Sequence, residues 1–321
     1  MNTKLKNFYF HGIMFHHFHD NKKHLPGQGS INRNQFKKMI NYIGRKNILS
    51  APEFIERYKQ KRLKKNHVCL TFDDSLKCQF DIALPVLEDY KIKAFFFVYS
   101  SAISNNPDLL EIYRYFRHNC YSSMDKFYED FFNNLPKQNK QKLNIFFKTK
   151  KKLIDDSTQK FSFYSENDIK FRLTRDLFLT NAIYKKVMKK LFEQKSFKIH
   201  KVKKNVFLQK KDIIKLHKLG HEIGLHSHTH PTKLEKLNYK KQFEEYNKNS
   251  LILKRILRIK KIKSMSHPCG SYNSDTLKIL KKMNVEIGFR QIMLDKRANP
   301  TQLEICRQDH SNIMRLMESS K

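Results

Sequence analysis

The chain has 321 residues, 39% of them hydrophobic and 26 of them phenylalanine, enough to bury the core of one large domain or two ordinary ones. Only 8 glycines and 8 prolines, and no repeat of fixed period, argue against a linker-rich or repetitive architecture. The formal net charge of +35 comes mostly from scattered lysines without a zinc-finger or RNA-recognition motif, which predicts a solvated basic surface and no specific nucleic-acid partner.

The five cysteines are Cys69, Cys78, Cys120, Cys269 and Cys306. An odd number without a CxxC pair argues against a disulfide framework and a structural zinc site, and indicates reduced thiols. The N-terminal residues lack the uninterrupted apolar stretch of a secretion signal, and no window reaches the roughly 18 apolar residues of a membrane span. We therefore expect a cytoplasmic protein without a membrane span.

Short apolar runs, rich in β-branched or aromatic residues, predict buried strands. They are FYFHGIMF (8–15), HVCLTFDD (67–74), AFFFVYS (94–100), HEIGLHS (221–227) and VEIGFR (285–290). Helical patterns lie between several of these runs, at 31–44, 81–91, 210–220, 241–257 and 274–284. This alternation predicts a parallel α/β fold, either a barrel or an open sheet.

The stretch 105–204 breaks the alternation, because its segments DKFYEDFFNNL, QKLNIFFKTKKKLI and DLFLTNAIYKKVMKKLFEQ predict consecutive amphipathic helices without strands. We interpret it as a helical insertion into a domain formed by 1–104 and 205–321. A lid, a substrate-binding subdomain and an oligomer contact all suit such an insertion. We predict that it packs beside the carboxyl ends of the strands on either side of it and that its lysines guide a phosphate-bearing ligand. A helical bulge that only widens the core or forms a dimer contact is the alternative.

Two adjacent carboxylates, Asp73 and Asp74, close the apolar run HVCLTF. At the carboxyl end of a strand, where α/β folds place their sites, one can bind a metal while its neighbour accepts a proton. Taken alone, the pair also suits a turn or a helix cap. The segment GHEIGLHSHTHPT adds His226, His228 and His230 after a second apolar run.

The i, i+4 spacing of His226 and His230 would put both imidazoles on one face of a helical turn, where they can bind one metal ion. Asp74 would supply a third ligand, leaving positions open for water and substrate, and His228 should point away. A further loop, SMSHPCGSYN (264–273), precedes a predicted helix. It can expose backbone N–H groups to an oxyanion, although by itself an ordinary β-to-α turn explains it.

The order TFDD (71–74), HSHTH (226–230) and HPCGSYN (267–273) resembles the polysaccharide deacetylases, carbohydrate esterases of family 4 that share the NodB homology domain. The resemblance covers roughly 8–104 and 205–310. It implies a distorted (β/α) barrel of about seven strands, a divalent metal, usually zinc, and hydrolysis of acetamido groups on sugars.

By position, the resemblance makes Asp73 the catalytic base and makes Asp74, His226 and His230 the metal ligands. Cys269 stands where the family usually has a tyrosine whose backbone N–H helps to form the oxyanion hole, a role that the main chain can keep. Two further positions depart from the family's pattern: Ser266 stands where an arginine usually accompanies the base, and Arg307 is a possible substitute.

The family's late Leu-x-His motif, which supplies the general acid, is not recognisable. His310 is one candidate, and the segment after the first predicted strand offers His16, His17 and His19. A surface or packing role is the alternative for each of them. The opening segment also resembles deacetylase-like proteins encoded with bacterial surface-polysaccharide genes.

We therefore expect a metal-dependent hydrolase that removes N-acetyl groups from a sugar or glycan precursor, nucleotide-linked or lipid-linked, in surface-polysaccharide biosynthesis. Metal and Asp73 would activate water, and a protonated histidine would assist the departing amine. Two alternatives remain open. One is an O-acetyl sugar esterase on the same site, and the other is a non-catalytic basic protein that binds anionic glycan, lipid or nucleic acid.

Overall fold

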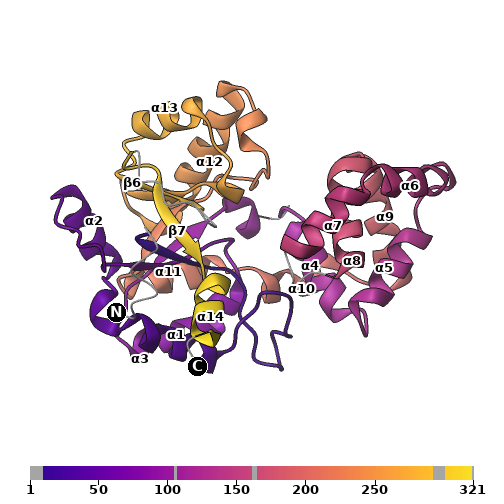
Figure 1. Ribbon diagram of the computed structural model, residues 1–321. Helices are drawn as coiled ribbons and strands as arrows, with labels where there is room; N and C mark the ends of the chain where they lie inside the picture. The colour runs from indigo at the N-terminus through magenta and orange to yellow at the C-terminus, as the bar shows by residue number, and fades with distance from the viewer. Residues whose placement is uncertain (1–9, 105–106, 161–164, 292–300, 320–321) are drawn as a thin grey trace. The chain divides into compact units, whose positions relative to one another are not determined.

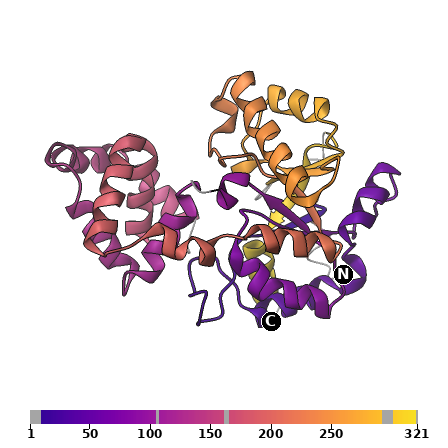
Figure 2. The same ribbon diagram turned by 180° about the vertical axis from the view of Figure 1, so that it is seen from behind.

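The computed structural model describes residues 10–104, 107–160, 165–291 and 301–319. The chain divides into two compact units, a barrel unit formed by Met1–Asp108 with Lys204–Lys321 and a helical unit, Leu109–Lys203 (Figures 1 and 2). None of the helices in these described ranges has the length and apolar character needed to cross a membrane.

The barrel unit contains a closed barrel of parallel strands whose order in space is their order along the chain. The strands are β1 (Gly12–Phe15), β2 (Cys69–Phe72), β3 (Phe95–Val98), β4 (Glu222–Leu225), β5 (Ser264–Ser266), β6 (Ile287–Gln291) and β7 (Ile305–Asp309). This confirms the expected distorted (β/α) barrel with seven strands. The beginning of the predicted first strand, at 8 and 9, lies outside the described residues.

Helices surround the barrel and connect successive strands. They are α1 (Arg33–Ile43), α2 (Ala51–Lys59), α3 (Leu84–Asp89), α11 (Lys210–Lys218), α12 (Tyr239–Leu257), α13 (Ser274–Lys282) and α14 (His310–Glu318). In Figures 1 and 2, α12 and α13 pack together on one side of the barrel, and α1 packs with α3 and α14 on the other. The helix predicted at 81–91 is divided into a π-helix, η3 (Gln79–Ala83), and α3.

Side-chain caps fix the starts of most of these helices, because the first backbone N–H groups of a helix have no partner within it. The capping side chains are those of Asn32, Ser50, Asn238, Asn273 and Asp309. Asn238 and Asn273 end the loops that follow β4 and β5, and Asp309 is the last residue of β7, so these caps set where the helices after the three strands begin.

Aromatic rings fill the interior of the barrel. Phe95, Phe97 and Phe289 pack there with Phe54 of α2, and the ring centroids of Phe95 and Phe289 are 5.2 Å apart. Gly224 leaves room for one of these rings, because a Cβ added to it would lie 2.5 Å from the Phe97 ring. With this volume filled by apolar groups, the polar side chains gather at the carboxyl ends of the strands.

The helical unit contains consecutive helices, as the amphipathic patterns predict. They are α4 (Leu110–Asn119), α5 (Met124–Asn133), α6 (Lys137–Thr149), α7 (Lys151–Lys160), α8 (Glu166–Leu173) and α9 (Asn181–Gln194), followed by α10 (Ile199–Val206), which runs into the barrel unit. Its core is aromatic: the ring of Phe171 lies 5.3 Å from that of Phe127 and 4.9 Å from that of Phe131. The position of this unit beside the catalytic mouth stays a prediction.

Candidate metal centre

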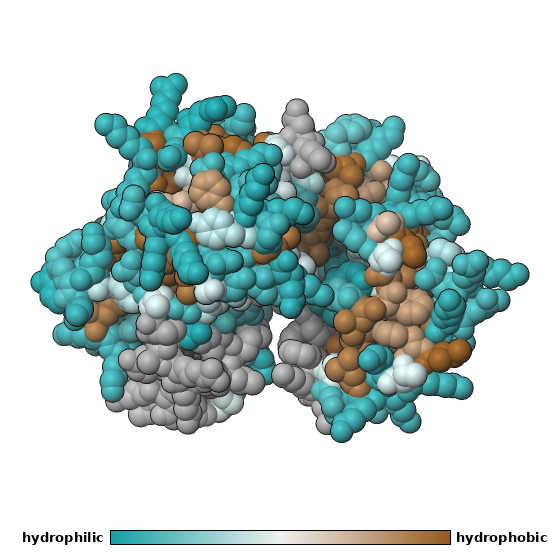
Figure 3. All heavy atoms as spheres, turned by 90° about the horizontal axis from the view of Figure 1, so that it is seen from above, coloured by the Kyte–Doolittle hydropathy of each residue, from teal (hydrophilic) through white to brown (hydrophobic). Residues whose placement is uncertain are grey.

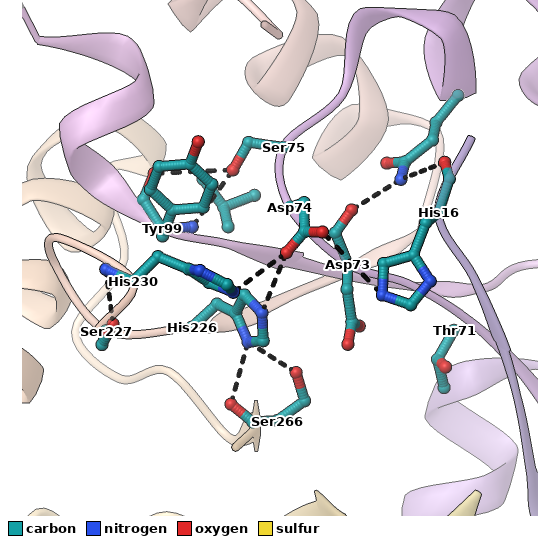
Figure 4. Close-up of polar contacts among 12 residues, drawn as sticks. His16, Thr71, Asp73, Asp74, Ser75, Tyr99, His226, Ser227, His230 and Ser266 are labelled. Carbon is teal, nitrogen blue, oxygen red and sulfur yellow. Dashed lines mark hydrogen bonds and ion pairs between the residues drawn. The ribbon is translucent and has the colours of Figure 1, made fainter. Parts of the chain in front are cut away.

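Polar side chains converge at the carboxyl ends of β1, β2 and β4 (Figure 4). In the register of β1 and β2, Phe15 pairs with Phe72, so His16 and Asp73 are the next residues of their strands. Asp74 follows Asp73, and His226 is the first residue after β4. Parallel strands therefore bring Asp74 and His226, which are 152 positions apart in sequence, together on one edge of the barrel.

Asp74, His226 and His230 form a compact group of buried donors. Asp74 Oδ1 lies 3.3 Å from Nε2 of His226 and 3.1 Å from Nε2 of His230. The exposed fractions of the three residues are 8%, 1% and 7%. One donor atom from each lies within 4.8 Å of the others, and among the described residues this is the one such group of His, Cys, Asp or Glu.

The contacts of His226 hold its ring so that Nε2 faces Asp74. Its Nδ1 lies 2.9 Å from the carbonyl oxygen and 2.7 Å from the hydroxyl oxygen of Ser266. In the tautomer that carries its proton on Nδ1, the ring donates to that carbonyl, and the lone pair on Nε2 faces Asp74 Oδ1. Two acceptors at 3.3 Å require a proton or a metal ion between them. One carboxylate oxygen with two imidazole nitrogens is a donor set that fits a divalent ion.

The loop after β4 differs from the helical turn that the i, i+4 spacing predicts. That prediction is wrong, because residues 226–230 form a loop with left-handed backbone at Ser227 (φ 63) and His230 (φ 55). The His230 N–H donates to Ser227 Oγ at 3.1 Å, which stabilises the turn. The ring of His228 lies outside the donor group, with Nδ1 2.9 Å from Ser100 Oγ.

Asn249 of α12 fixes the position of His226 through a hydrogen bond to its backbone. Its side-chain oxygen accepts the backbone N–H of His226 at 3.0 Å, and its amide donates to the carbonyl of Val98 at 2.9 Å. Asn249 is fully buried, so it joins the ends of β3 and β4 without competition from water. The sequence pattern gave no reason to select this residue, since it lies in the middle of an amphipathic helix.

Arg307 of β7 contacts Asp73. This is the contact expected of a substitute for the arginine that the family usually has at the position of Ser266. Its Nη1 and Nη2 donate to the two carboxylate oxygens of Asp73, both at 2.7 Å, and Nη1 also donates to Thr71 Oγ1 at 3.0 Å. Burial raises the pKa of Asp73, but the charge of Arg307 holds it below its ordinary value. Asp73 is thus an ionised carboxylate inside the barrel.

Gly12 makes room for this arginine. Arg307 pairs with Gly12 in the sheet, and a Cβ added to Gly12 would lie 2.6 Å from Arg307 Cγ. Any other residue at position 12 would therefore crowd the stem of the side chain that reaches Asp73.

Among the predicted proton donors, the structure brings His16 to the site. Its Nε2 lies 3.8 Å from Asp74 Oδ2, and 27% of its side chain is exposed. The backbone carbonyl of His17 accepts a hydrogen bond from the Ile31 N–H, and its ring stacks with that of His16, with the ring centroids 6.3 Å apart. His310 is buried against Phe15, with Nε2 3.0 Å from the carbonyl of Gly29. The sequence contained a signal for His16, because it is the first residue after an apolar run.

Cys269 lies in the 3-10 turn η7 (Pro268–Gly270) that follows β5. It is exposed and has left-handed backbone, with φ 52. The next N–H groups, of Gly270 and Ser271, donate to carbonyls within the turn. The role of the Cys269 N–H in an oxyanion hole stays a prediction.

The comparisons with known proteins agree with this geometry. A sequence profile described as "Polysaccharide deacetylase" matches residues 60–120 and 179–288, more than half of the chain. A comparison with curated protein sequences returned no match.

Solved structures with a similar fold include deacetylase PplD of Streptococcus pyogenes in complex with acetate, at 16% identity and a TM-score of 0.54, covering 97% of this chain and 98% of that one. A de-N-acetylase from Aggregatibacter actinomycetemcomitans matches at 14% identity and a TM-score of 0.54, over 93% of both chains. IcaB from Ammonifex degensii matches at 12% identity and a TM-score of 0.55, over 96% and 95%. At these identities the likeness concerns the fold alone. Because the family profile covers more than half of the chain, including β2 and the loop with His226 and His230, the chain belongs to the polysaccharide deacetylase family.

Proposed function

We propose that this polysaccharide deacetylase is a metal-dependent hydrolase that removes N-acetyl groups from a sugar or glycan precursor. The observation that most supports this is an ionised carboxylate, Asp73, placed directly beside the three-donor group of Asp74, His226 and His230. A base next to a metal site is the arrangement that activates water for attack on an amide. The similar structures include one named as a de-N-acetylase, which supports an amide substrate.

Asp74, His226 and His230 would hold the metal ion, which we propose to be zinc. When bound, such an ion polarises the acetamide carbonyl and lowers the pKa of water. The hydrogen bond from His226 Nδ1 to the Ser266 carbonyl keeps Nε2 directed at the site.

The chain's own groups carry the proton transfers. Asp73 receives a proton from the attacking water at a carboxylate oxygen, and Arg307 fixes the orientation of that carboxylate through both oxygens. His16 then donates a proton from Nε2 to the departing amine nitrogen. The backbone N–H of Cys269 would bind the oxyanion.

We place the reaction in the cytoplasm, on a precursor that carries phosphate. The structure describes all five cysteines and joins none of them by a disulfide, which fits a reducing compartment. The excess of lysine fits a nucleotide-linked or lipid-linked sugar, because positive charge attracts phosphate.

Acetate release tests the proposal. The zinc-loaded protein is incubated with N-acetyl and O-acetyl sugars, free and nucleotide-linked, and Asp73→Asn and His226→Ala are compared with the parent. We expect release from the N-acetyl substrates, retained metal but little activity in Asp73→Asn, and loss of both in His226→Ala. Equal loss of metal in the two variants would mean that the roles of Asp73 and Asp74 are wrongly assigned. Release from esters alone would make the protein an O-acetyl esterase, and no release with any sugar would favour a binding protein.

A further inference from the structure

A cluster of exposed lysines lies in the helical unit, on α6 and at the start of α7, where Asp155 and Asp156 follow one turn after the last of these lysines. Residues 131–154 contain seven lysines and neither Asp nor Glu. All seven are exposed, and in the part of the chain that the structure describes none of them has an acidic partner. They are Lys137, Lys140, Lys142, Lys148, Lys150, Lys151 and Lys152.

Other lysines of the same unit are paired. Lys170 Nζ lies 2.6 Å from Glu166 on the preceding turn of α8, and Lys126 lies 3.3 Å from Glu129 on α5. The helices of this unit therefore form ordinary ion pairs where acidic residues are available. The positive charge of α6 is left for an external partner.

Large aliphatic side chains are exposed on α6, on α7 and on a neighbouring π-helix. The exposed fractions are 65% for Ile145 of α6, 39% for Leu153 of α7 and 55% for Leu177 of the π-helix η5 (Thr174–Phe178). The rings of Phe146 and Phe178, the neighbours of Ile145 and Leu177 in the chain, lie 5.0 Å apart, so α6 and η5 adjoin. Figure 3 shows apolar side chains gathered on a face of the helical unit, which lies on the right in that view.

On α6 the exposed aliphatic residue, Ile145, has lysines on both sides of it. Residues three apart on a helix are neighbours on its surface, so Ile145 lies between Lys142 and Lys148. Single exposed apolar residues are common in proteins, but exposed aliphatic residues bordered by unpaired lysines are typical of helices that lie on membranes.

We propose that α6, with Leu153 and Leu177, is a docking surface for an anionic phospholipid bilayer. A nucleic acid would use the lysines and gain little from exposed isoleucine and leucine. A bilayer accommodates both, because the aliphatic groups enter the boundary between headgroups and acyl chains while lysine ammonium groups bind lipid phosphates. Peripheral binding of this kind needs no membrane-spanning helix.

Vesicle co-sedimentation of the full chain tests this surface. We expect binding to vesicles of phosphatidylcholine mixed with phosphatidylglycerol and much weaker binding to phosphatidylcholine alone. Added salt should reduce the binding, since exposed charges are screened beyond about 8 Å at physiological ionic strength. Lys142→Gln combined with Lys148→Gln should weaken the partition by about tenfold or more, because each lysine near an anionic surface contributes about 1 kcal/mol. Ile145→Ser combined with Leu177→Ser should weaken it by at least about tenfold through lost apolar burial.

Matched controls come from α12 of the barrel unit. Lys240→Gln with Lys241→Gln removes the same charge from exposed positions, and Leu251→Ser removes a leucine that is 51% exposed. These variants should bind vesicles like the parent, and circular dichroism should show that every variant is folded.

Three results would overturn the proposal. The first is equal binding to neutral and anionic vesicles, and the second is equal loss in the α6 variants and the α12 controls. The third is tight binding of single-stranded DNA together with vesicle binding that the Ile145→Ser and Leu177→Ser changes leave unaltered, which would make α6 a general polyanion site. The assay contains no acetylated sugar, so its failure and a failure of deacetylation are separate results.

Discussion

Replacing Arg307 by methionine would remove the cation that donates to both carboxylate oxygens of Asp73 while keeping an apolar stem inside the barrel. Asp73 and Arg307 are 2% and 1% exposed, and two hydrogen bonds of 2.7 Å join them. Removing one partner of a buried ion pair leaves an uncompensated charge and typically costs about 3 to 5 kcal/mol of unfolding free energy. We expect Arg307→Met to lose an amount in this range, together with deacetylase activity.

A double-mutant cycle separates this charge effect from lost packing. Urea unfolding is measured for the parent, Arg307→Met, Asp73→Asn and the double variant, all with a chelator present so that metal binding does not contribute. The double variant has no buried charge at this position and should recover at least about half of the stability lost by Arg307→Met. A loss below about 1 kcal/mol for Arg307→Met, or a double variant as unstable as the sum of the two single changes, would refute the reasoning.

Three further changes probe the support of the site and of the barrel. Gly12→Ala should displace the Arg307 side chain, since the new Cβ would lie 2.6 Å from its Cγ, and it should therefore lower kcat. An unchanged kcat would show that the strands shift to accommodate the new methyl group. Asn249→Leu removes the side-chain oxygen that accepts the backbone N–H of His226, so it should lower metal affinity about 10-fold to 100-fold. A chelator competition titration measures this affinity, and an unchanged value would contradict the reasoning. Burial raises the pKa of Glu222 to about 7. The protonated side chain therefore contributes fully to stability below pH 4.5, and this contribution is lost as pH rises through about 7. Glu222→Gln should therefore gain up to about 3 kcal/mol relative to the parent at about pH 8.5 and little at about pH 5, measured by urea unfolding.

Hydrophobic patterning predicted the strands with several large apolar residues in succession, and it missed β5 and β7. β5 consists of SMS, with Ser264 and Ser266 fully buried, and β7 consists of ICRQD with Arg307 buried. These polar residues face the inside of the barrel, where they serve the site. A pattern that identifies strands by alternation of apolar and polar residues has no means to recognise a strand whose inner face is polar.

The sequence predicted which residues form the site better than it predicted how they are arranged. The adjacent aspartates and the clustered histidines selected the donor residues, because few packing arrangements explain such a pattern. The choice between His16 and His17 depended on the register of β1 with β2, which places His16 level with Asp73. The hydrogen bond of His226 to Ser266 joins residues 40 positions apart, and only tertiary structure shows it.

Local backbone conformation explains how the predicted donors converge without the helical turn that their spacing suggested. Five of the eleven non-glycine residues described with positive φ lie in the loops of the site: Asp74, Ser75, Ser227, His230 and Cys269. Left-handed backbone costs a non-glycine residue about 1 to 2 kcal/mol, so glycine would be the expected choice.

Serine persists at two of these positions because its hydroxyl stabilises the turn. Ser75 Oγ accepts the Tyr99 N–H at 3.1 Å, and Ser227 Oγ accepts the His230 N–H at 3.1 Å. Each bond contributes roughly 1 kcal/mol, comparable with the conformational cost that it opposes. The first ties the loop of Asp74 to the end of β3, and the second aims His230 at Asp74. The donors therefore converge through strained turns held by side chains, and a helical repeat counted along the sequence does not describe them.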